Sequence, residues 1–383
     1  MTSSFLKQYI IMLTSVMQTK VHMTWEKTAD SFFTLRGGMS CPYWLLEVAD
    51  SCKLTNGKKG MHVMRYKKLQ SGNIEISEMT LGTWVVGGRN AYGAVDRNDS
   101  IKAVRAMIER GVNSIDTAPV YGNGYAEQLL AEALTGFDRE KLFITTKFGL
   151  APNYGTKPIP SIRDNTYKNV MREVQSSLSN IACGYIDCYM IHYFDENTPL
   201  SETMAALNYL KSQGAIRYIG VSNFTQEQIE KAQEYGKVDF FQMAYSMVNR
   251  SQEELLKWAY SKGIDIMSYG SLGSGILSGA IRATPDFVGK RDIRASFYGE
   301  LYKEPKFTNI MKLLEKMDVI ANAHGKPVAQ VAINWSTQKQ FMTTILVGVR
   351  NDAEAAENCA AFEWKLTDSE IATLDQALVE LGL

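Results

Sequence analysis

Four residues in the middle of the chain combine an acid, a phenol, an amine and an imidazole in positions that suit proton transfer. Asp116 and Tyr121 lie close together in SIDTAPVYGNGYAEQLL, Lys147 ends the run LFITTK, and His192 ends IDCYMIH. Each acid or base ends an apolar run of the kind that forms a buried strand. Taken singly they could be a helix cap, a packed tyrosine, a solvated lysine and a core histidine. As a set they favour a catalytic site.

A general acid is the role that suits Tyr121. A free phenol has a pKa of about 10, and we expect the ammonium group of Lys147 to lower it. Asp116 would keep Lys147 charged and directed, because an ammonium group buried without a partner is costly. A neutral His192 would hydrogen-bond a substrate carbonyl oxygen and turn it toward the phenol.

Two glycines, Gly122 and Gly124, follow the tyrosine in the same stretch. Glycine adopts backbone conformations that other residues avoid, so the chain can turn sharply here and leave the phenol open to substrate. A turn that only leads into the next helix explains them equally well.

Eight apolar or β-branched runs alternate with amphipathic stretches and must position these side chains. Strict alternation predicts right-handed βαβ units and a parallel sheet. Eight units in about 280 residues favour an α/β fold of the closed (β/α)8 TIM barrel type, whose active site lies at the carboxyl ends of the strands. An open doubly wound sheet would carry a G-x-G-x-x-G turn after its first strand, and none is present there. The predicted strands are one ending near Trp84, then residues 112–117, 142–147, 186–192, 216–222, 239–244, 264–269 and 343–348.

Other elements follow from spacing and turn residues. A hairpin is predicted around residues 71–73, before the first barrel strand, and further helices are expected near the C-terminus. The clearest helix carries Val170, Val174, Leu178 and Ile181 on one face. Pro327 suits the first position of another helix.

Residues 1–63 lack any sustained helical or strand period. The apolar run YIIML is too short for a signal-peptide core or a membrane span. We expect this segment to be a disordered extension or an upstream in-frame translation, with residues 64–383 forming the barrel. A partner-binding arm is the alternative.

Composition excludes several classes of partner. The 41 basic and 41 acidic residues balance, which argues against nucleic acid or an anionic membrane surface as a partner. The five cysteines and four histidines show no metal-ligand spacing. We therefore expect reduced thiols, no metal site and a cytoplasmic location, and the sequence leaves the oligomeric state open.

The motifs D-T-A-x-x-Y-G, T-K, I-D-x-x-x-I-H and GVSNF, in this order, resemble those of the aldo-keto reductases from about Met64 to the C-terminus. Within that family, RDIRASFYGE and YFDENTPL are most similar to bacterial enzymes encoded near inositol-utilisation genes. The resemblance implies NAD(P)H-dependent reduction of aldehydes or ketones, or oxidation of sugar or polyol hydroxyls. It implies the catalytic tetrad Asp116, Tyr121, Lys147 and His192.

Two alternative functions belong to other classes. Barrels of this family also serve ion channels as regulatory subunits that bind the cofactor with little turnover. A lyase that forms a Schiff base on Lys147 is a third hypothesis, which the neighbouring tyrosine and GVSNF do not suit.

The resemblance also implies where the nicotinamide dinucleotide lies. In GSLGSG, small residues would let backbone N–H groups approach a pyrophosphate on chemical grounds alone. Arg350 suits a ribose 2′-phosphate, whereas Glu354 would repel one, accept a bond from a free 2′-hydroxyl, bind adenine or pair with Arg350. NADP is therefore predicted, with NAD possible. The cofactor residues are Ser222, Asn223 and Gln242 at the carboxamide, Tyr269 on the nicotinamide ring, and Leu272, Gly273, Ser274, Gly275, Gly348, Arg350, Glu354 and Asn358 along the remainder.

The substrate pocket is less defined by the sequence. Trp84, at the first strand exit, is predicted to line it, and the segment 277–306 to close over it. Tyr298, Tyr302 and Arg294 in that segment could face a sugar or carboxylate, or lie on the loop surface.

Overall fold

The computed structural model describes residues 64–87, 96–152, 161–285 and 298–383, together with three short strands nearer the N-terminus. The chain divides into two units, Met1–Met61 and His62–Leu383. In the first unit β1 (Trp25–Lys27), β2 (Phe33–Leu35) and β3 (Ser40–Cys41) pair antiparallel, where the sequence shows no strand pattern. That residues 1–63 are an extension remains a prediction.

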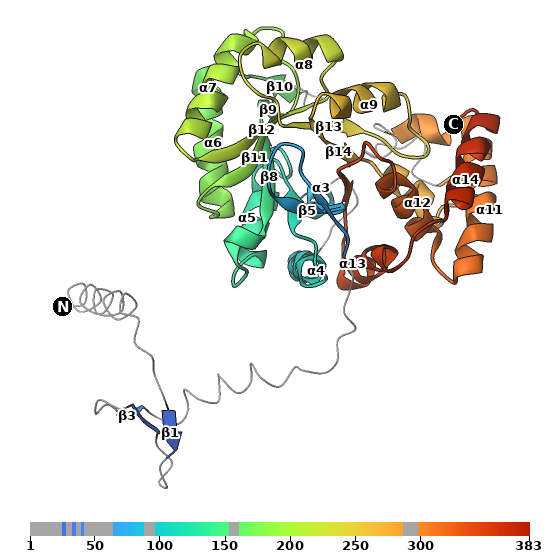
Figure 1. The fold of residues 1–383 in the computed structure, drawn as a ribbon, viewed down its shortest axis with the longest axis horizontal. Coiled ribbons are helices and arrows are strands. Elements are labelled where there is room, and N and C mark those ends of the chain that lie inside the picture. Colours follow the sequence, from blue (N-terminus) through green and yellow to red (C-terminus); the bar gives the residue numbers. More distant parts are fainter. Residues whose placement is uncertain are drawn as a thin grey trace. The chain divides into compact units, whose positions relative to one another are not determined.

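Eight parallel strands close into a barrel in the second unit, as the sequence predicts (Figure 1). The first strand ends at Gly82, and Trp84 opens the short helix α3 (Trp84–Gly87) that follows it. In barrel order the strands are β6 (Met79–Gly82), β7 (Ser114–Asp116), β8 (Phe143–Phe148), β11 (Ile186–Ile191), β12 (Ile216–Ser222), β13 (Phe240–Ala244), β14 (Asp265–Tyr269) and β15 (Thr344–Val347).

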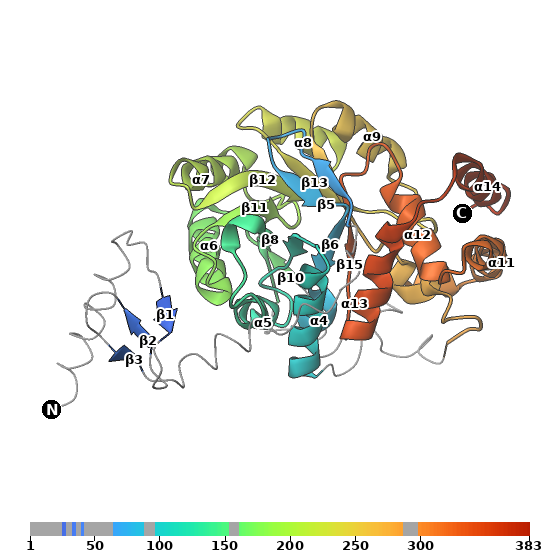
Figure 2. The same cartoon turned by 60° about the horizontal axis from the view of Figure 1, so that its bottom comes forward.

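Helices form the outer layer and follow the strands in turn (Figure 2). The predicted helix of residues 170–181 is α6, which buries Val170, Val174 and Ile181. Pro327 precedes its helix instead of opening it, because its ψ of 148° is extended. The outer helices are α4 (Arg97–Glu109), α5 (Tyr125–Ala133), α6 (Tyr167–Ile181), α7 (Leu200–Ser212), α8 (Gln226–Gln233), α9 (Glu253–Ser261), α12 (Val328–Thr337) and α13 (Asp352–Cys359).

Additional helices extend the barrel, as predicted. The long helix α11 (Lys306–His324) precedes α12. Helix α14 (Asp368–Glu380), near the C-terminus, packs beside α11 (Figures 1 and 2). Short 3₁₀ turns lie at Arg139–Lys141, Gly273–Ser278, Gly299–Tyr302 and Ala360–Glu363, and a small sheet of β9 (Leu150–Pro152) and β10 (Ser161–Arg163) follows β8. Within the described residues no helix is long and apolar enough to cross a membrane.

The predicted hairpin, β4 (Tyr66–Lys68) and β5 (Glu75–Ser77), closes the amino end of the barrel. Its apolar residues Leu69 and Ile76 pack on barrel-interior side chains that include Phe143 and Phe240. The backbone of Ser71 donates to the carboxylate of Asp265, at the start of β14. The hairpin therefore fills the end of the barrel that lies opposite the carboxyl ends of the strands.

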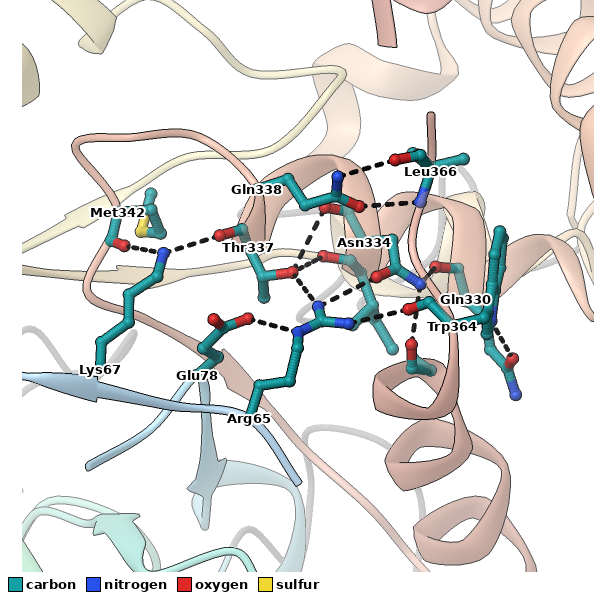
Figure 3. Close-up of polar contacts among 12 residues, drawn as sticks. Arg65, Lys67, Glu78, Gln330, Asn334, Thr337, Gln338, Met342, Trp364 and Leu366 are labelled. Carbon is teal, nitrogen blue, oxygen red and sulfur yellow. Dashed lines mark hydrogen bonds and ion pairs between the residues drawn. The ribbon is translucent and has the colours of Figure 1, made fainter. Parts of the chain in front are cut away.

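Partly buried polar contacts tie the hairpin to the C-terminal helices (Figure 3). Arg65 donates to Glu78 at 2.9 Å, to the Trp364 carbonyl at 2.8 Å and to Asn334 at 3.0 Å. Lys67 donates to the carbonyl of Thr337, the last residue of α12, and to the carbonyl of Met342, in the loop before β15. The bond to Thr337 satisfies a carbonyl group at the C-terminal end of α12, where no later turn of the helix can do so.

Candidate active site

The four predicted catalytic residues come from three neighbouring strands and the loop after one of them. Asp116 is the last residue of β7, Lys147 the fifth of β8, and His192 follows β11 directly. Tyr121 lies in the turn between β7 and α5. Parallel strands present their carboxyl ends at the same mouth of a barrel, so all four side chains lie there.

Lys147 joins the acid to the phenol. Its Nζ donates to Asp116 Oδ1 at 2.6 Å, to the Thr117 carbonyl at 3.1 Å and to Tyr121 Oη at 3.3 Å. Lys147 and Asp116 are almost entirely buried. Such a buried charge pair persists only where hydrogen bonds satisfy both partners, and here they do.

The phenol of Tyr121 differs from the sequence prediction in its ionisation. Burial, together with the negative charge of Asp116, holds the pKa of Tyr121 well above its ordinary value. The prediction that Lys147 lowers this pKa is wrong for the site as it stands. The physical reason is that the Lys147 charge is largely offset by Asp116, only 2.6 Å away, while burial opposes the phenolate. Tyr121 therefore holds its proton at neutral pH.

His192 is neutral, as predicted. Burial, aided by the positive charge of Lys147, holds the pKa of His192 well below its ordinary value. Its ring lies edge-on to Tyr121, with 6.1 Å between ring centroids, and stacks on Tyr193 at 5.3 Å. A neutral imidazole can donate one hydrogen bond to a ligand without placing a second buried charge at the mouth.

The loop after Tyr121 is shaped by its glycines. Gly122, Asn123 and Gly124 all have positive φ, at 67°, 56° and 84°. A Cβ on Gly122 would lie 1.9 Å from the Gly87 carbonyl oxygen, so only glycine fits there. Gly124 caps α5. These residues thus make a tight turn that places Tyr121, which accounts for both glycines.

Four of the predicted cofactor residues lie beside the tetrad. Asn223, at φ 59°, donates to the His192 carbonyl at 3.2 Å and accepts from Tyr269 Oη at 2.8 Å. Gln242 donates from Nε2 to Asp116 Oδ2 at 2.8 Å. Ser222 accepts from Asn223 at 3.0 Å. These four side chains form a polar edge that bonds to two members of the tetrad, at the His192 carbonyl and the Asp116 carboxylate.

The glycine-rich segment after β14 leaves open space beside Gly275. A Cβ on Gly275 would meet no atom within 4 Å, and Ser274 takes φ 57°. A left-handed serine costs of order 1 kcal/mol, and such residues often lie at functional sites. Leu272 and Gly273 complete the turn, whose backbone bonds are Gly273 to Gly270 and Gly275 to Leu272.

The segment after β15 holds four of the predicted cofactor residues, Gly348, Arg350, Glu354 and Asn358. Arg350 donates from Nε and Nη2 to Glu354 Oε1 at 2.9 and 2.6 Å, and its backbone N–H reaches Glu354 Oε2 at 2.8 Å. Of the options that the sequence left open for Glu354, pairing with Arg350 is the one observed. A Cβ on Gly348 would lie 2.7 Å from Val85, so this glycine lets the end of β15 pack against α3. Asn358 is buried on α13.

The predicted substrate residues are only partly placed at the mouth. Trp84 is half-buried at the first strand exit, and the Tyr298 hydroxyl lies close to Gly270 after β14. Tyr302 instead packs in the core against Phe307, because η3 (Gly299–Tyr302) turns it under α11. Arg294 lies outside the described residues.

Several contacts of the mouth were not predicted from the sequence. Arg163 lies 5.3 Å from the Tyr193 ring centroid and donates to the Phe194 carbonyl. Buried Glu127 accepts from Thr146, the residue before Lys147, at 2.8 Å. The Y-G-x-x-x-x-E spacing could have marked Glu127 as a residue of the Tyr121 loop; nothing in the sequence marks Arg163.

A cavity of about 500 Å³ lies between α8 and α9, lined by residues that include Asn223, Met243 and Leu255. None of the four tetrad residues lines it. Cys183, Cys188 and Cys359 are buried and free, and no cluster of metal-ligating side chains occurs in the described part of the chain.

Comparison with known proteins shows the family to which the chain is similar. The aldo/keto reductase family model matches residues 78–379. An NADH-specific methylglyoxal reductase of Escherichia coli is 33% identical over 329 residues, covering 82% of this chain and 98% of that protein. The aldo-keto reductase YhdN of Bacillus subtilis is 30% identical over 310 residues, covering 80% and 91%. The solved glycerol dehydrogenase AKR11B4 of Gluconobacter oxydans superposes with a TM-score of 0.73 at 29% identity, covering 84% and 96%.

Proposed function

The chain belongs to the aldo/keto reductase family, and from that premise we propose that Tyr121 is the proton donor of its reaction. The protein is an NAD(P)-dependent oxidoreductase that reduces carbonyl groups. The observation that carries the proposal is the position of Lys147 Nζ, 2.6 Å from the Asp116 carboxylate and 3.3 Å from the Tyr121 hydroxyl.

The residues present suit a nicotinamide cofactor. Among the described residues none bonds to Gln242 Oε1, the space beside Gly275 is open, and Tyr269 offers an aromatic face beside Asn223. When bound, the reduced nicotinamide supplies the hydride that a carbonyl carbon accepts. Ser222, Asn223 and Gln242 would hold its carboxamide.

The protein's own side chains control the proton. Tyr121, protonated at rest, donates from Oη to the substrate oxygen. His192, neutral, donates a ring N–H to the same oxygen and orients it. Lys147 stabilises the phenolate that Tyr121 becomes, and Asp116 holds the lysine in place. In the opposite direction the phenolate accepts the proton of an alcohol.

For the substrate, we infer a small aldehyde or ketone that carries further oxygen atoms, with polyol oxidation as the reverse reaction. The relative from Escherichia coli takes its name from methylglyoxal, and the solved relative from glycerol; both are three-carbon compounds. The likeness to enzymes of inositol-utilisation operons remains a prediction and adds cyclic polyols to the substrates to be tried.

For the cofactor, the sequence predicts NADP on the strength of Arg350. The Arg350 to Glu354 pair favours use of NADH as well, because the carboxylate occupies the guanidinium and would repel a 2′-phosphate. We propose that NADH binds at least as tightly as NADPH. Glu354→Gln should then raise NADPH affinity about tenfold and leave NADH affinity nearly unchanged, as measured by fluorescence titration. Equal effects on both cofactors would contradict this assignment.

The test of the catalytic proposal is Tyr121→Phe. Turnover of methylglyoxal with saturating NADH should fall by roughly 10²- to 10⁴-fold, while the cofactor Kd stays within about twofold. Tyr209→Phe, on the exposed surface of α7, is the matched control and should retain full activity. Full activity of the Tyr121 variant would refute the role of Tyr121. If the wild-type protein binds the cofactor tightly but turns over none of the carbonyl compounds or polyols, the regulatory-subunit alternative gains support.

A further inference from the structure

The side chain of Gln242 bonds to the tetrad itself, and not only to the place where a cofactor would lie. Gln242 is almost fully buried on β13, and its Nε2 lies 2.8 Å from Asp116 Oδ2. An ionised carboxylate accepts hydrogen bonds and donates none, so the amide nitrogen of Gln242, not its oxygen, must face Asp116.

The two oxygens of Asp116 thus have different donors. Oδ1 accepts from Lys147 at 2.6 Å, and Oδ2 accepts from Gln242 at 2.8 Å. Two donors on opposite oxygens fix the rotation of the carboxylate about its χ2 bond, which is otherwise broad. The direction of Lys147 toward Tyr121 depends on that orientation, because the ammonium group must reach both groups at once.

The other end of the Gln242 amide points away from the tetrad. Its Oε1 has no hydrogen bond to any described residue. The adjoining Asn223 donates its backbone N–H to the Gln242 carbonyl at 3.1 Å and holds Tyr269 through its side chain. One amide group therefore lies between the proposed nicotinamide site and the buried acid.

We propose that Gln242 is a positioning residue that orients Asp116 and Lys147 for proton donation by Tyr121. The inference rests on the proposed function, since it needs Tyr121 to be the proton donor. It goes beyond the carboxamide contact that the family resemblance implies, because it gives Gln242 an effect on the proton-transfer step when the cofactor is already bound.

The charge of Asp116 affects the pKa of two neighbouring side chains. Burial and neighbouring carboxylates, Asp116 among them, raise the pKa of Cys188, and Asp116 contributes to the raised pKa of Tyr121. A further charge beside Asp116 would therefore be felt by the whole site. The titratable groups around Asp116 and Gln242 are Lys147 on β8, Tyr121 after β7, Cys188 on β11, His192 and Tyr193 after β11, and Tyr269 on β14.

Gln242→Glu tests this with little change of shape. Two buried carboxyl groups within hydrogen-bond distance cannot both ionise easily, so they share one proton. While that proton is present, the introduced carboxyl group can donate to Asp116 as the amide did, and the net charge matches the wild-type site. When the proton is lost at higher pH, two carboxylates repel each other and the orientation of Asp116 is lost.

The expected result is a pH-dependent defect. At saturating NADH, the ratio of variant to wild-type kcat should fall at least about tenfold as pH rises and the carboxyl pair loses its shared proton. Gln242→Met, which cannot donate at any pH, should lower kcat about 10- to 100-fold without that pH dependence. The same protein samples give the cofactor Kd by fluorescence titration.

Ser222→Ala is the matched control. Ser222 is proposed to hold the same carboxamide but bonds to Asn223 and not to Asp116. This variant should weaken cofactor binding, yet its kcat ratio to wild type at saturating NADH should not vary with pH.

The outcomes separate this inference from the proposed function. A kcat ratio for Gln242→Glu that stays constant across pH, while Tyr121→Phe is inactive, overturns the positioning role alone. An active Tyr121→Phe overturns the proposed function and the inference with it. If Gln242→Met does not fold, the ratio measured for Gln242→Glu still decides.

Discussion

The buried charge pair of Asp116 and Lys147 predicts non-additive effects of mutation. Asp116→Asn leaves the Lys147 ammonium group without an anionic partner, and Lys147→Met leaves the Asp116 carboxylate with only Gln242 as a side-chain donor. Both side chains are about 1% exposed, so solvent cannot replace the missing partner.

The size of the effect follows from that burial. Removing one partner of a buried pair costs about 3–5 kcal/mol, because a charge remains in a low-dielectric site. Replacing both partners with neutral groups leaves no unpaired charge and is often close to neutral. We therefore expect Asp116→Asn and Lys147→Met each to lose about 3–5 kcal/mol of unfolding free energy, and the double variant to be at least as stable as either.

The assay is urea unfolding of all four proteins, followed by tryptophan fluorescence, with turnover of methylglyoxal measured in parallel. Turnover should be lost in the double variant too, since the phenolate of Tyr121 then lacks its neighbouring cation. Recovery of stability without recovery of activity would separate the structural from the catalytic role of the pair. A double variant whose loss equals the sum of the two single losses would refute the reasoning.

Three further predictions concern other parts of the barrel. The pKa of His192 is lower in the folded protein than its unfolded value of about 6.5. The stability that its neutral form contributes is therefore present above a pH of about 6.5 and is lost as pH falls toward the folded pKa. His192→Gln should lose less unfolding free energy than the wild type between pH 7 and 5, as measured by urea unfolding. Gly122→Ala should lower kcat at least tenfold by displacing Tyr121, because its Cβ would lie 1.9 Å from the Gly87 carbonyl oxygen. The control Gly136→Ala, with φ 88° and no atom within 4 Å, should cost only about 1 kcal/mol of unfolding free energy and keep full activity. Similar activities for the two variants would contradict this account of the turn. Arg65→Met should cost about 3 kcal/mol of unfolding free energy, because the hairpin loses its bonds to the C-terminal helices, and kcat should be retained. The control Lys68→Met, on the exposed part of β4, should have little effect on the unfolding midpoint. A large loss of kcat in the Arg65 variant would contradict the view that the hairpin end does not affect the mouth.

The cofactor contacts show where reasoning from single residues is insufficient. Arg350 and Glu354 could each be matched to a cofactor by chemistry, but their mutual bond depends on the start of α13, where Glu354 in the first turn reaches back to Arg350, the residue before the N-cap Asn351. The Glu354 carboxylate therefore bonds to Arg350. The electrostatic field that a 2′-phosphate would meet is therefore decided by the helix and not by either residue type.

The sequence by itself determined the barrel and the place of the four proposed tetrad residues at its mouth. Apolar runs alternating with amphipathic stretches can bury their surface only as repeated βαβ units, and the polar residue at each strand end must then lie at the mouth. Only the tertiary structure decided that Gln242 bonds to Asp116, that Tyr302 lies in the core, and that the Tyr121 phenol keeps its proton. These features depend on distances between residues far apart in the chain and on the degree of burial. Local periodicity carries no information on either, because it fixes the face on which a side chain lies and not its partners.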